Sequence, residues 1–386
     1  MKKAFKTEIM LSPAQKQKVN QTIGTCRYVY NLYIKTAQSF YKETGKYLSG
    51  YDFSKWLNNV YTKEKDAWIK DVSSKAVKQA IMNGDRAFKN FFKGLANFPR
   101  FKKKKDQYVK AYFPKNNPTD LIVERHRIKV PTIGWVRFKE YGYIPTNLNV
   151  ISCRISQCAN RYYISVLFEV KQSTKSLMRY EGIGVDLGIK NLAVCSHNKV
   201  FLNINKTLKF KKIEKQLKRQ QRKLSRRDEQ NKKQKGGEFC TKNRQKQVIR
   251  LQKLHARLTN IRIEYIRYVV NELVRAKPAY ITIEDLNTKG MMKNRYLAKS
   301  IKEQCFGYFK KWLIDKCNEY GIELRQVSRF YPSSKLCSNC GIKKVKLSLS
   351  ERIFRCDHCQ SEIERDFNAS LNLKYATKYK VLTKVT

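Results

Sequence analysis

Residues 182–188 read Gly-Ile-Gly-Val-Asp-Leu-Gly, an apolar stretch that carries one carboxylate, Asp186, close to its end. The small and β-branched residues favour a buried strand, and Gly188 favours a turn directly after it. A carboxylate at the end of such a strand is costly unless water or a cation solvates it. The stretch therefore predicts a buried strand that ends either at an ordinary turn or at a site for cations.

Segments on both sides of this strand suggest the order of the surrounding elements. We expect strands at 181–187, 191–197 and 199–203, a long helical region, a strand at 279–283, a helix at 300–320, a strand at 322–327 and a closing helix at about 366–376. This order, β-β-β-α-β-α-β-α, is typical of the ribonuclease H fold. In that fold the first strand, the fourth strand and the last helix converge at one end of the sheet.

Two further acids fall at those converging positions. Glu284 ends the strand that begins near Ala279, and Asp366 opens the last helix, while Asp285 is expected to face away from Glu284. Each acid alone has an ordinary explanation, as a strand end at a turn or, for Asp366, as a helix N-cap. Together with Asp186 they can hold two magnesium ions. Two such ions activate water and stabilise the leaving oxygen in phosphodiester cleavage, which predicts metal-dependent hydrolysis of nucleic acid.

Four of the eleven cysteines form a metal-ligand pattern. Cys337 and Cys340 make one CxxC pair, Cys356 and Cys359 make a second, and Gly341 follows the first pair where a tight turn is needed. Four thiolates at this spacing fit tetrahedral zinc and leave no position for water, so the expected zinc ion is structural. The remaining cysteines are expected to be buried apolar side chains in a reducing compartment.

The composition is strongly basic. Lys and Arg number 82 and Asp and Glu number 31, which gives a net charge of +51. Such a charge repels itself unless a polyanion binds it, so nucleic acid is the expected partner. A basic protein of the membrane surface fits less well, because 41% hydrophobic and 12% aromatic residues indicate a folded core. The chain has no apolar run of about 18 residues and no signal-peptide pattern at its start, so we expect a cytoplasmic, nucleoid-associated protein without a membrane partner.

A basic helical hairpin is expected at 206–276. Apolar residues recur at helical spacing in two arms, and Gly236 and Gly237 interrupt the pattern between them. The first arm, residues 206–235, is rich in Lys and Arg and poor in acids. We expect this arm to contact phosphates, the alternative being a charged face that only meets solvent.

The first half of the chain separates into a helical and a β-rich segment. Ser12, Pro13 and Gln15 form a helix-start signal, and residues 11–99 predict a helical unit. Short β-prone runs follow at 121–123, 127–130, 135–138, 151–155 and 162–170. They predict a small β-barrel in which the helical unit is inserted after a first strand at 2–10.

Several motifs resemble the transposon-encoded TnpB proteins, which are relatives of the type V CRISPR effector nucleases. The motifs are Gly184–Gly188, Ile283–Leu286, Ser333–Gly341 and Arg365–Asn372, in the order that the family has. The resemblance is strong over about 181–373. It is looser in the first half, where it rests on residues 85–92 and 99–102.

The resemblance implies an RNA-guided DNA endonuclease with a RuvC-type domain, in which Asp186, Glu284 and Asp366 are the catalytic acids and magnesium ligands. It implies a guide RNA derived from the transposon end and a double-stranded DNA target beside a short target-adjacent motif. We expect a monomer. Two alternatives stay open: an RNA-guided DNA-binding repressor without cleavage, against which the intact acids argue, and a strand-transfer transposase, which shares the acids.

The resemblance also makes Lys75, Lys78 and Gln79 candidate contacts to the target duplex, since Lys75 and Gln79 lie one helical turn apart. The expected multidomain α/β architecture joins a ribonuclease H-like domain with a β-barrel domain. Its parts are a wedge-like β-barrel (1–10 and 100–178), a helical recognition domain (11–99), a RuvC-like domain (179–336 and 360–376) with the hairpin (206–276), a zinc-binding insert (337–359) and a flexible basic tail (377–386).

Overall fold

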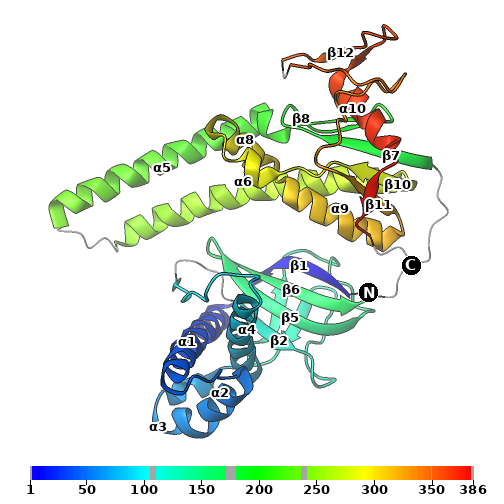
Figure 1. The fold of residues 1–386 in the computed structure, drawn as a ribbon. Helices are drawn as coiled ribbons and strands as arrows, with labels where there is room; N and C mark the ends of the chain where they lie inside the picture. Colours follow the sequence, from blue (N-terminus) through cyan, green and yellow to red (C-terminus); the bar gives the residue numbers. More distant parts are fainter. Residues whose placement is uncertain (1, 105–109, 171–179, 236–240, 349, 384–386) are drawn as a thin grey trace. The chain divides into compact units, whose positions relative to one another are not determined.

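A computed structural model describes residues 2–104, 110–170, 180–235, 241–348 and 350–383 (Figure 1). The chain divides into two compact units, Met1–Lys171 and Gln172–Thr386. Each unit has its own sheet and its own hydrophobic core. None of the described helices combines the length and the apolar character that a membrane crossing requires.

A six-stranded antiparallel sheet forms the β part of the first unit, in the order β2-β5-β6-β1-β4-β3. The strands are β1 (Lys2–Met10), β2 (Ala111–Pro114), β3 (Arg127–Val130), β4 (Gly134–Phe138), β5 (Asn149–Cys158) and β6 (Arg161–Glu169). β1 pairs with both β6 and β4, so the first residues of the chain are central to the sheet. Alternate side chains of β6, such as Ile164, Val166 and Phe168, are buried in the core on one face.

The helices of the first unit lie between β1 and β2 in the sequence. They are α1 (Pro13–Thr44), α2 (Gly50–Trp56), a π-helical turn (Leu57–Tyr61), α3 (Thr62–Glu64), a 3₁₀ turn (Ala67–Asp71) and α4 (Ser74–Phe92). The predicted start of α1 is confirmed, because Ser12 and Gln15 each accept a hydrogen bond from the other's backbone N–H. Buried Tyr33, Phe53 and Ile81 join α1, α2 and α4 in a core of their own.

The second unit is built on a six-stranded mixed sheet in the order β14-β11-β10-β7-β8-β9. Its strands are β7 (Tyr180–Leu187), β8 (Asn191–Cys195), β9 (Val200–Leu202), β10 (Pro278–Ile283), β11 (Glu323–Val327) and β14 (Tyr379–Val381). β7 runs antiparallel to β8 and parallel to β10, which runs parallel to β11. Apart from β14, these are the strands that the sequence predicts for this part of the chain.

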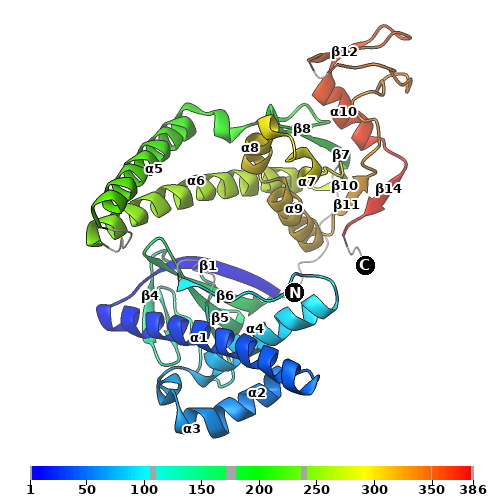
Figure 2. The same ribbon diagram turned by 60° about the vertical axis from the view of Figure 1, so that its left-hand side comes forward.

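Two long helices, α5 (Leu208–Lys235) and α6 (Lys242–Arg275), confirm the predicted arms of the hairpin. α5 contacts the first half of α6, and this part of the hairpin extends away from the sheet (Figure 2), whereas the second half of α6 packs in the core of the unit. The arms pack through apolar side chains that include Phe210, Ile213, Leu217 and Leu258. The predicted interruption at Gly236 and Gly237 lies outside the described residues.

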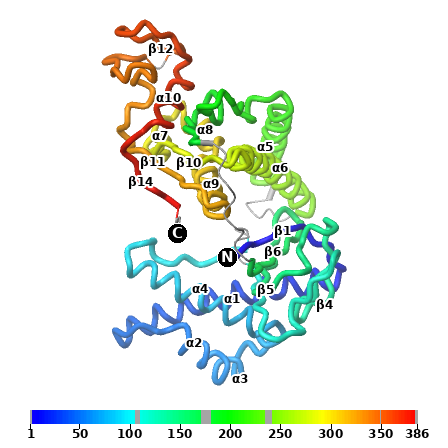
Figure 3. The backbone as a smooth tube through the Cα atoms, turned by 90° about the vertical axis from the view of Figure 1, so that its right-hand side faces the viewer, coloured from blue at the N-terminus to red at the C-terminus, as the bar shows by residue number. Residues whose placement is uncertain are grey.

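The remaining helices of the second unit lie around this sheet, and a small two-stranded hairpin lies beyond it. They are α7 (Thr288–Met291), α8 (Arg295–Gln304), α9 (Phe306–Tyr320), the hairpin β12 (Ile353–Arg355) and β13 (Glu362–Glu364), and α10 (Arg365–Lys374). Val185 of β7 is buried in the core with α6 and α9, whereas Gly184 faces α10. The segment around β12 projects beyond α10, away from the sheet (Figure 3).

The prediction of a single helix at 300–320 is wrong, because two helices, α8 and α9, cover this stretch. Cys305 has a left-handed backbone with φ of 52° and separates α8 from α9. The break lets the Gln304 amide donate to the carbonyl oxygen of Gly188 at 2.9 Å while Phe306 enters the core. These tertiary contacts outweigh the helical preference of the local sequence.

Two further expectations need correction. Leu121 has a φ of 55°, and only Val123 of the expected strand at 121–123 pairs, in an isolated bridge to Ile128. The expected flexible tail at 377–386 instead contains β14, which pairs antiparallel with β11, and the Leu324 N–H donates to the Thr383 hydroxyl at 3.0 Å. Backbone pairing with a distant strand and the hydrogen bond to the Thr383 hydroxyl hold the tail as far as Thr383, and 384–386 lie outside the described residues.

Candidate active site and metal centre

The three predicted acids meet in one cavity of the second unit. Asp186 lies on β7, Glu284 directly follows β10, and Asp366 lies in the first turn of α10. β7 and β10 are adjacent parallel strands in which Val185 pairs with Ile283, so the next residue of each strand lies at the same edge. All three acids line a cavity of about 630 Å³.

The acids interact electrostatically. Burial raises the pKa of Asp186 well above its ordinary value, and repulsion from Glu284 and Asp366 raises it further against the opposing effect of Arg365. Burial also raises the pKa of Glu284, while a hydrogen bond donated by the Ser333 hydroxyl opposes this rise. Carboxyl groups in such surroundings ionise readily only when cations offset their charge, and oxygen-rich sites of this kind suit magnesium.

Cationic and apolar residues complete the wall of this acid cavity. The cations are Lys190, Lys206, Lys335, Arg352 and Arg365. The large apolar side chains are Leu187, Ile189, Met291, Leu297, Phe306 and Leu347. A cavity that combines carboxylates with a surrounding set of cations offers ligands for divalent metal and attraction for a polyanion at the same place.

Asp285 stands outside the acid cavity, although it follows Glu284 directly. Its carboxylate accepts hydrogen bonds from Gln326 at 2.9 Å and from Arg329 at 3.0 Å. Lys310 lies 4.0 Å from the same carboxylate. Asp285 is therefore a surface ion-pair residue and a natural control for Glu284.

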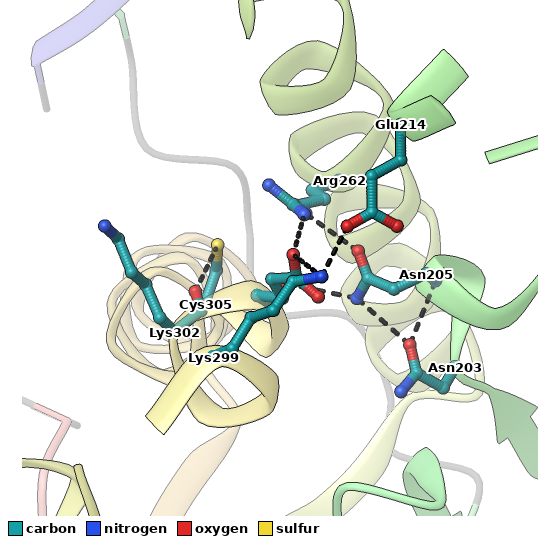
Figure 4. Close-up of polar contacts among 8 residues, drawn as sticks. Asn203, Asn205, Glu214, Arg262, Lys299, Lys302 and Cys305 are labelled. Carbon is teal, nitrogen blue, oxygen red and sulfur yellow. Dashed lines mark hydrogen bonds and ion pairs between the residues drawn. The ribbon is translucent and has the colours of Figure 1, made fainter. Parts of the chain in front are cut away.

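A polar cluster lies at the base of the hairpin (Figure 4). The Arg262 guanidinium donates to Asn205 at 2.7 Å and pairs with Glu303 at 3.1 Å. Asn205 donates to Asn203 at 3.0 Å, and Asn203 donates to the carbonyl oxygen of Ile189 at 2.8 Å. Ile189 lines the acid cavity, so the cluster ties one wall of that cavity to the hairpin.

The four predicted cysteines come together at the tip of the second unit. Their sulfur atoms all lie within 4.8 Å of one another. Cys337 and Cys359 are 3.6 Å apart and Cys340 and Cys356 are 3.5 Å apart, too far for disulfides of about 2.05 Å. Thiolates around zinc, with bonds of about 2.3 Å, are about 3.8 Å from one another in a regular tetrahedron. The cluster therefore fits a four-thiolate metal site.

Local structure prepares one of these thiols, Cys359, for a cation. In the metal-free cluster a backbone hydrogen bond from Ile342 lowers the pKa of Cys340, but burial and hydrogen bonds with the other cysteines outweigh it and raise this pKa to about 12. The Ser361 hydroxyl lies 3.1 Å from the Cys359 sulfur, and its hydrogen bond lowers the pKa of Cys359 to about 5. Gly341, with φ of 76°, and Gln360, with φ of 56°, form the left-handed turns after each pair of cysteines. Phe354 is fully buried against the cluster. A thiolate at neutral pH is the form that zinc binds.

The three candidate DNA contacts on α4 do not share one environment. Lys75 pairs with Asp120 at 3.2 Å, and Lys78 lies 5.5 Å from the centre of the Tyr51 ring. Gln79 donates to Asn83 at 3.0 Å. Of the three, Gln79 lines a cavity, which has a volume of about 390 Å³ and lies within the first unit.

This cavity, the basic hollow, was missed by sequence reasoning. Its cationic lining residues are Arg86, Lys102, Lys110 and Arg154. No carboxylate is among its described lining residues. Two of the cations stack on tyrosine rings, Lys102 on Tyr30 at 5.2 Å and Arg154 on Tyr112 at 5.4 Å. Four cations that far apart in the sequence give no local pattern, so only the fold reveals the site.

Two acids of the basic arm α5 form ion pairs with neighbouring helices. Glu214 pairs with Lys299 of α8, and Asp228 pairs with Arg244 of α6 at 2.8 Å. These acids therefore fasten the hairpin and neutralise cations that lie outside α5. The resulting excess of positive charge along α5 is the surface on which we expect phosphate contacts.

Comparisons with known proteins identify the family. Family models match residues 1–46, described as "Helix-turn-helix domain", residues 165–295, described as "Probable transposase", and residues 306–373, described as "Cas12f1-like, TNB domain". In this structure residues 2–44 form a strand and one long helix. The "Putative RNA-guided DNA endonuclease InsQ" of Escherichia coli (strain K12) is 29% identical over 385 residues, covering 96% of this chain and 91% of the relative.

A "Putative RNA-guided DNA endonuclease" of Streptomyces pristinaespiralis is 30% identical over 379 residues, covering 97% of this chain and 89% of the relative. At this identity over nearly all of both chains, the chain belongs to the TnpB family of transposon-encoded proteins. A solved structure, "Cryo-EM structure of the Cas12f1-sgRNA-target DNA complex", has a similar fold, with a TM-score of 0.58 and 13% identity over 98% of this chain and 99% of that chain.

Proposed function

We propose that this protein is an RNA-guided, metal-dependent endonuclease that cleaves double-stranded DNA beside a short target-adjacent motif. The observation that carries the proposal is the meeting of Asp186, Glu284 and Asp366 in one cavity. The raised pKa of Asp186 supports it, because a carboxylate cluster that costs energy in the free protein gains by binding cations. The names of the two curated relatives agree with it.

We further propose that residues 179–336 and 360–376 form a RuvC-type, ribonuclease H-like domain. The strand order β9-β8-β7-β10-β11 and the antiparallel β7–β8 pair support this assignment. The sheet of the first unit would be the wedge-like domain (1–10 and 100–178), with the helical recognition domain (11–99) inserted. The segment 337–359 would be the insert that holds one structural zinc ion through its four thiolates.

The acid cavity suggests how the chain's own residues serve the reaction. Asp186 and Glu284, whose pKa values are raised, would lose their protons to hold magnesium together with Asp366, and Arg365 would help by favouring the ionised form of Asp186. Magnesium ions held by these three acids would supply an activated water and would stabilise the leaving oxygen. Lys190, Lys206 and Lys335 would attract the DNA backbone to the cavity and orient the scissile phosphate.

Guide and target binding would use the basic surfaces. A guide RNA derived from the transposon end would supply sequence specificity by base pairing, while the protein contacts backbones. The arm α5 and the basic hollow offer the cations for this role. Gln79, which lines the hollow, would face the target duplex, together with Lys75 and Lys78 of the same helix.

A strand-transfer transposase is the second candidate, because one matching family model is described as "Probable transposase". The same acids serve both reactions. The products separate them, since hydrolysis leaves free ends and strand transfer leaves joined molecules. A repressor that binds DNA without cleaving it is a third outcome, against which the intact acids argue.

The decisive experiment purifies the protein from its host locus, sequences the RNA that co-purifies, and supplies a plasmid that matches this RNA. We expect linear plasmid with free ends in magnesium and none with Asp186→Ala. Asp285→Asn, a change in the neighbouring surface acid, is the matched control and should cleave normally. Equal inactivity of the wild type and Asp186→Ala, with target binding retained, would favour the repressor.

A further inference from the structure

The hydroxyl of Ser333 is aimed at the candidate catalytic acid Glu284. Ser333 is 4% exposed, and its Oγ donates a hydrogen bond to Glu284 Oε1. The two residues are far apart in the sequence, since Glu284 directly follows β10 and Ser333 lies in the loop after β11. A buried donor of this kind fixes the orientation of a carboxylate that is otherwise free to rotate about its side-chain bonds.

The position of Ser333 is itself fixed by the helix that carries Asp366. Asn372 of α10 donates from Nδ2 to the carbonyl oxygen of Ser333 at 2.7 Å and to that of Leu336 at 2.8 Å. Asn368, one turn earlier, donates to the same Leu336 carbonyl at 2.7 Å. Both asparagines are buried, with exposed fractions of 8% and 0%. Their amides have few alternative partners, so they act as a clamp on the loop.

The clamp also reaches the cysteine cluster. The Ser338 backbone N–H, between the two cysteines of the first pair, donates to Asn368 Oδ1 at 2.9 Å. The single segment from Ser333 to Ser338 therefore contacts Glu284 at one end and enters the four-thiolate site at the other. Through Asn368 and Asn372, it is joined to the helix that carries Asp366.

We propose that Ser333 is a positioning residue that holds the Glu284 carboxylate in the orientation needed to bind a divalent ion. Asn368 and Asn372 then hold the loop that carries Ser333 at a fixed position relative to Asp366, which lies on the same helix as both asparagines. The inference rests on the proposed function, since it takes Glu284 as a metal ligand. Partners that orient a ligating group typically contribute about 10–100-fold to metal affinity.

The test measures metal binding directly as well as cleavage. Manganese binding to the zinc-loaded full chain is followed by electron paramagnetic resonance for the wild type, Ser333→Ala and Ser350→Ala. Ser350 is an exposed serine between the two pairs of cysteines, and its hydrogen bonds to other described residues go to Ser348, which makes it the matched control. We expect about tenfold weaker binding for Ser333→Ala and wild-type binding for Ser350→Ala.

The magnesium dependence of cleavage separates positioning from a general structural role. Ser333→Ala should need about tenfold more magnesium for half-maximal cleavage and should recover at saturating magnesium. Zinc content and melting temperature, measured alongside, confirm that the fold is kept. If Ser333→Ala does not fold, the near-isosteric pair Ser333→Thr and Ser333→Val isolates the hydroxyl, with only the threonine variant expected to bind manganese like the wild type.

If Ser333→Ala binds manganese as tightly as the wild type, and the wild type cleaves its target, the inference is overturned and the proposed function stands. Equal affinity of the threonine and valine variants would do the same. A wild-type protein that neither binds manganese at this site nor cleaves its target would overturn the proposed function, and the inference with it.

Discussion

Gly184 of β7 and Ser370 of α10 lie in direct backbone contact: a Cβ placed on Gly184 would come within 1.9 Å of the Ser370 carbonyl oxygen. The same Cβ would lie 2.5 Å from the backbone nitrogen of Lys374. Only glycine permits this approach, because backbone atoms cannot rotate away as a side chain can. The contact fixes how closely the helix carrying Asp366 approaches the strand carrying Asp186.

Gly184→Ala should therefore push α10 from β7 and separate the two acids. We expect the free energy of unfolding to fall by about 1–3 kcal/mol, as for overpacked cores, and cleavage to be lost. Gly307→Ala is the control, since among the described residues no atom beyond its chain neighbours and its own helix backbone lies within 4 Å of the added Cβ, and alanine favours the helix. Urea unfolding measures both variants, and wild-type stability of Gly184→Ala would contradict the close contact.

Stability without added magnesium should depend on pH through Asp186. Because burial and the neighbouring acids raise its pKa, the stability contributed by the protonated form is present below the ordinary value of 3.8 and is lost as pH rises through the raised pKa. Asp186→Asn lacks this titration. Its melting temperature should exceed that of the wild type by an increasing margin as pH rises, with zinc retained. Parallel curves for the two proteins would refute the raised pKa.

Replacing Cys337 or Cys356 by serine should release zinc and destabilise the region from Ser333 to Leu373. Native-state hydrogen exchange should show lost protection in β12, β13 and α10, since classical zinc sites contribute folding energy outright. Cys158→Ser, a change at an exposed cysteine of the first unit, is the control. Unchanged melting after zinc chelation would remove the structural role of the metal.

The basic hollow should contribute to nucleic-acid binding through its charge. Arg86→Ala and Arg154→Ala should each weaken binding at low salt and reduce the slope of log affinity against log salt by about 1. Fluorescence anisotropy with labelled guide RNA and labelled duplex shows which polymer each residue contacts. Lys46→Ala, at an exposed loop after α1, is the control for total charge. Unchanged slopes for both arginine variants would exclude the hollow from the binding surface.

Local signals in the sequence predicted much of this structure. The start of α1 at Ser12 follows from side chains three residues apart, and the two cysteine pairs indicate their own ligand set. The meeting of Asp186, Glu284 and Asp366 required the element order in addition, because it depends on which strands become neighbours. Here the expected order was present, so the acids share one cavity.

The features that sequence reasoning missed all depend on contacts between distant residues. The left-handed Cys305 is set by packing of Gln304 and Phe306 on both sides of it. β14 forms because β11 offers an unpaired edge to the tail. The bond between Ser333 and Glu284 has no signature at all in the sequence, since a serine beside a cysteine pair is unremarkable until the loop after β11 is placed.

The central claim is that Asp186, Glu284 and Asp366 gather around shared divalent ions. Anomalous diffraction from manganese-soaked crystals of the zinc-loaded protein tests it most directly. We predict two manganese peaks about 4 Å apart, each bound by carboxylate oxygens of these residues. Carboxylate oxygens of these residues more than about 10 Å apart would contradict the claim, because they could not bridge two ions about 4 Å apart. Manganese bound elsewhere in the protein would also contradict it.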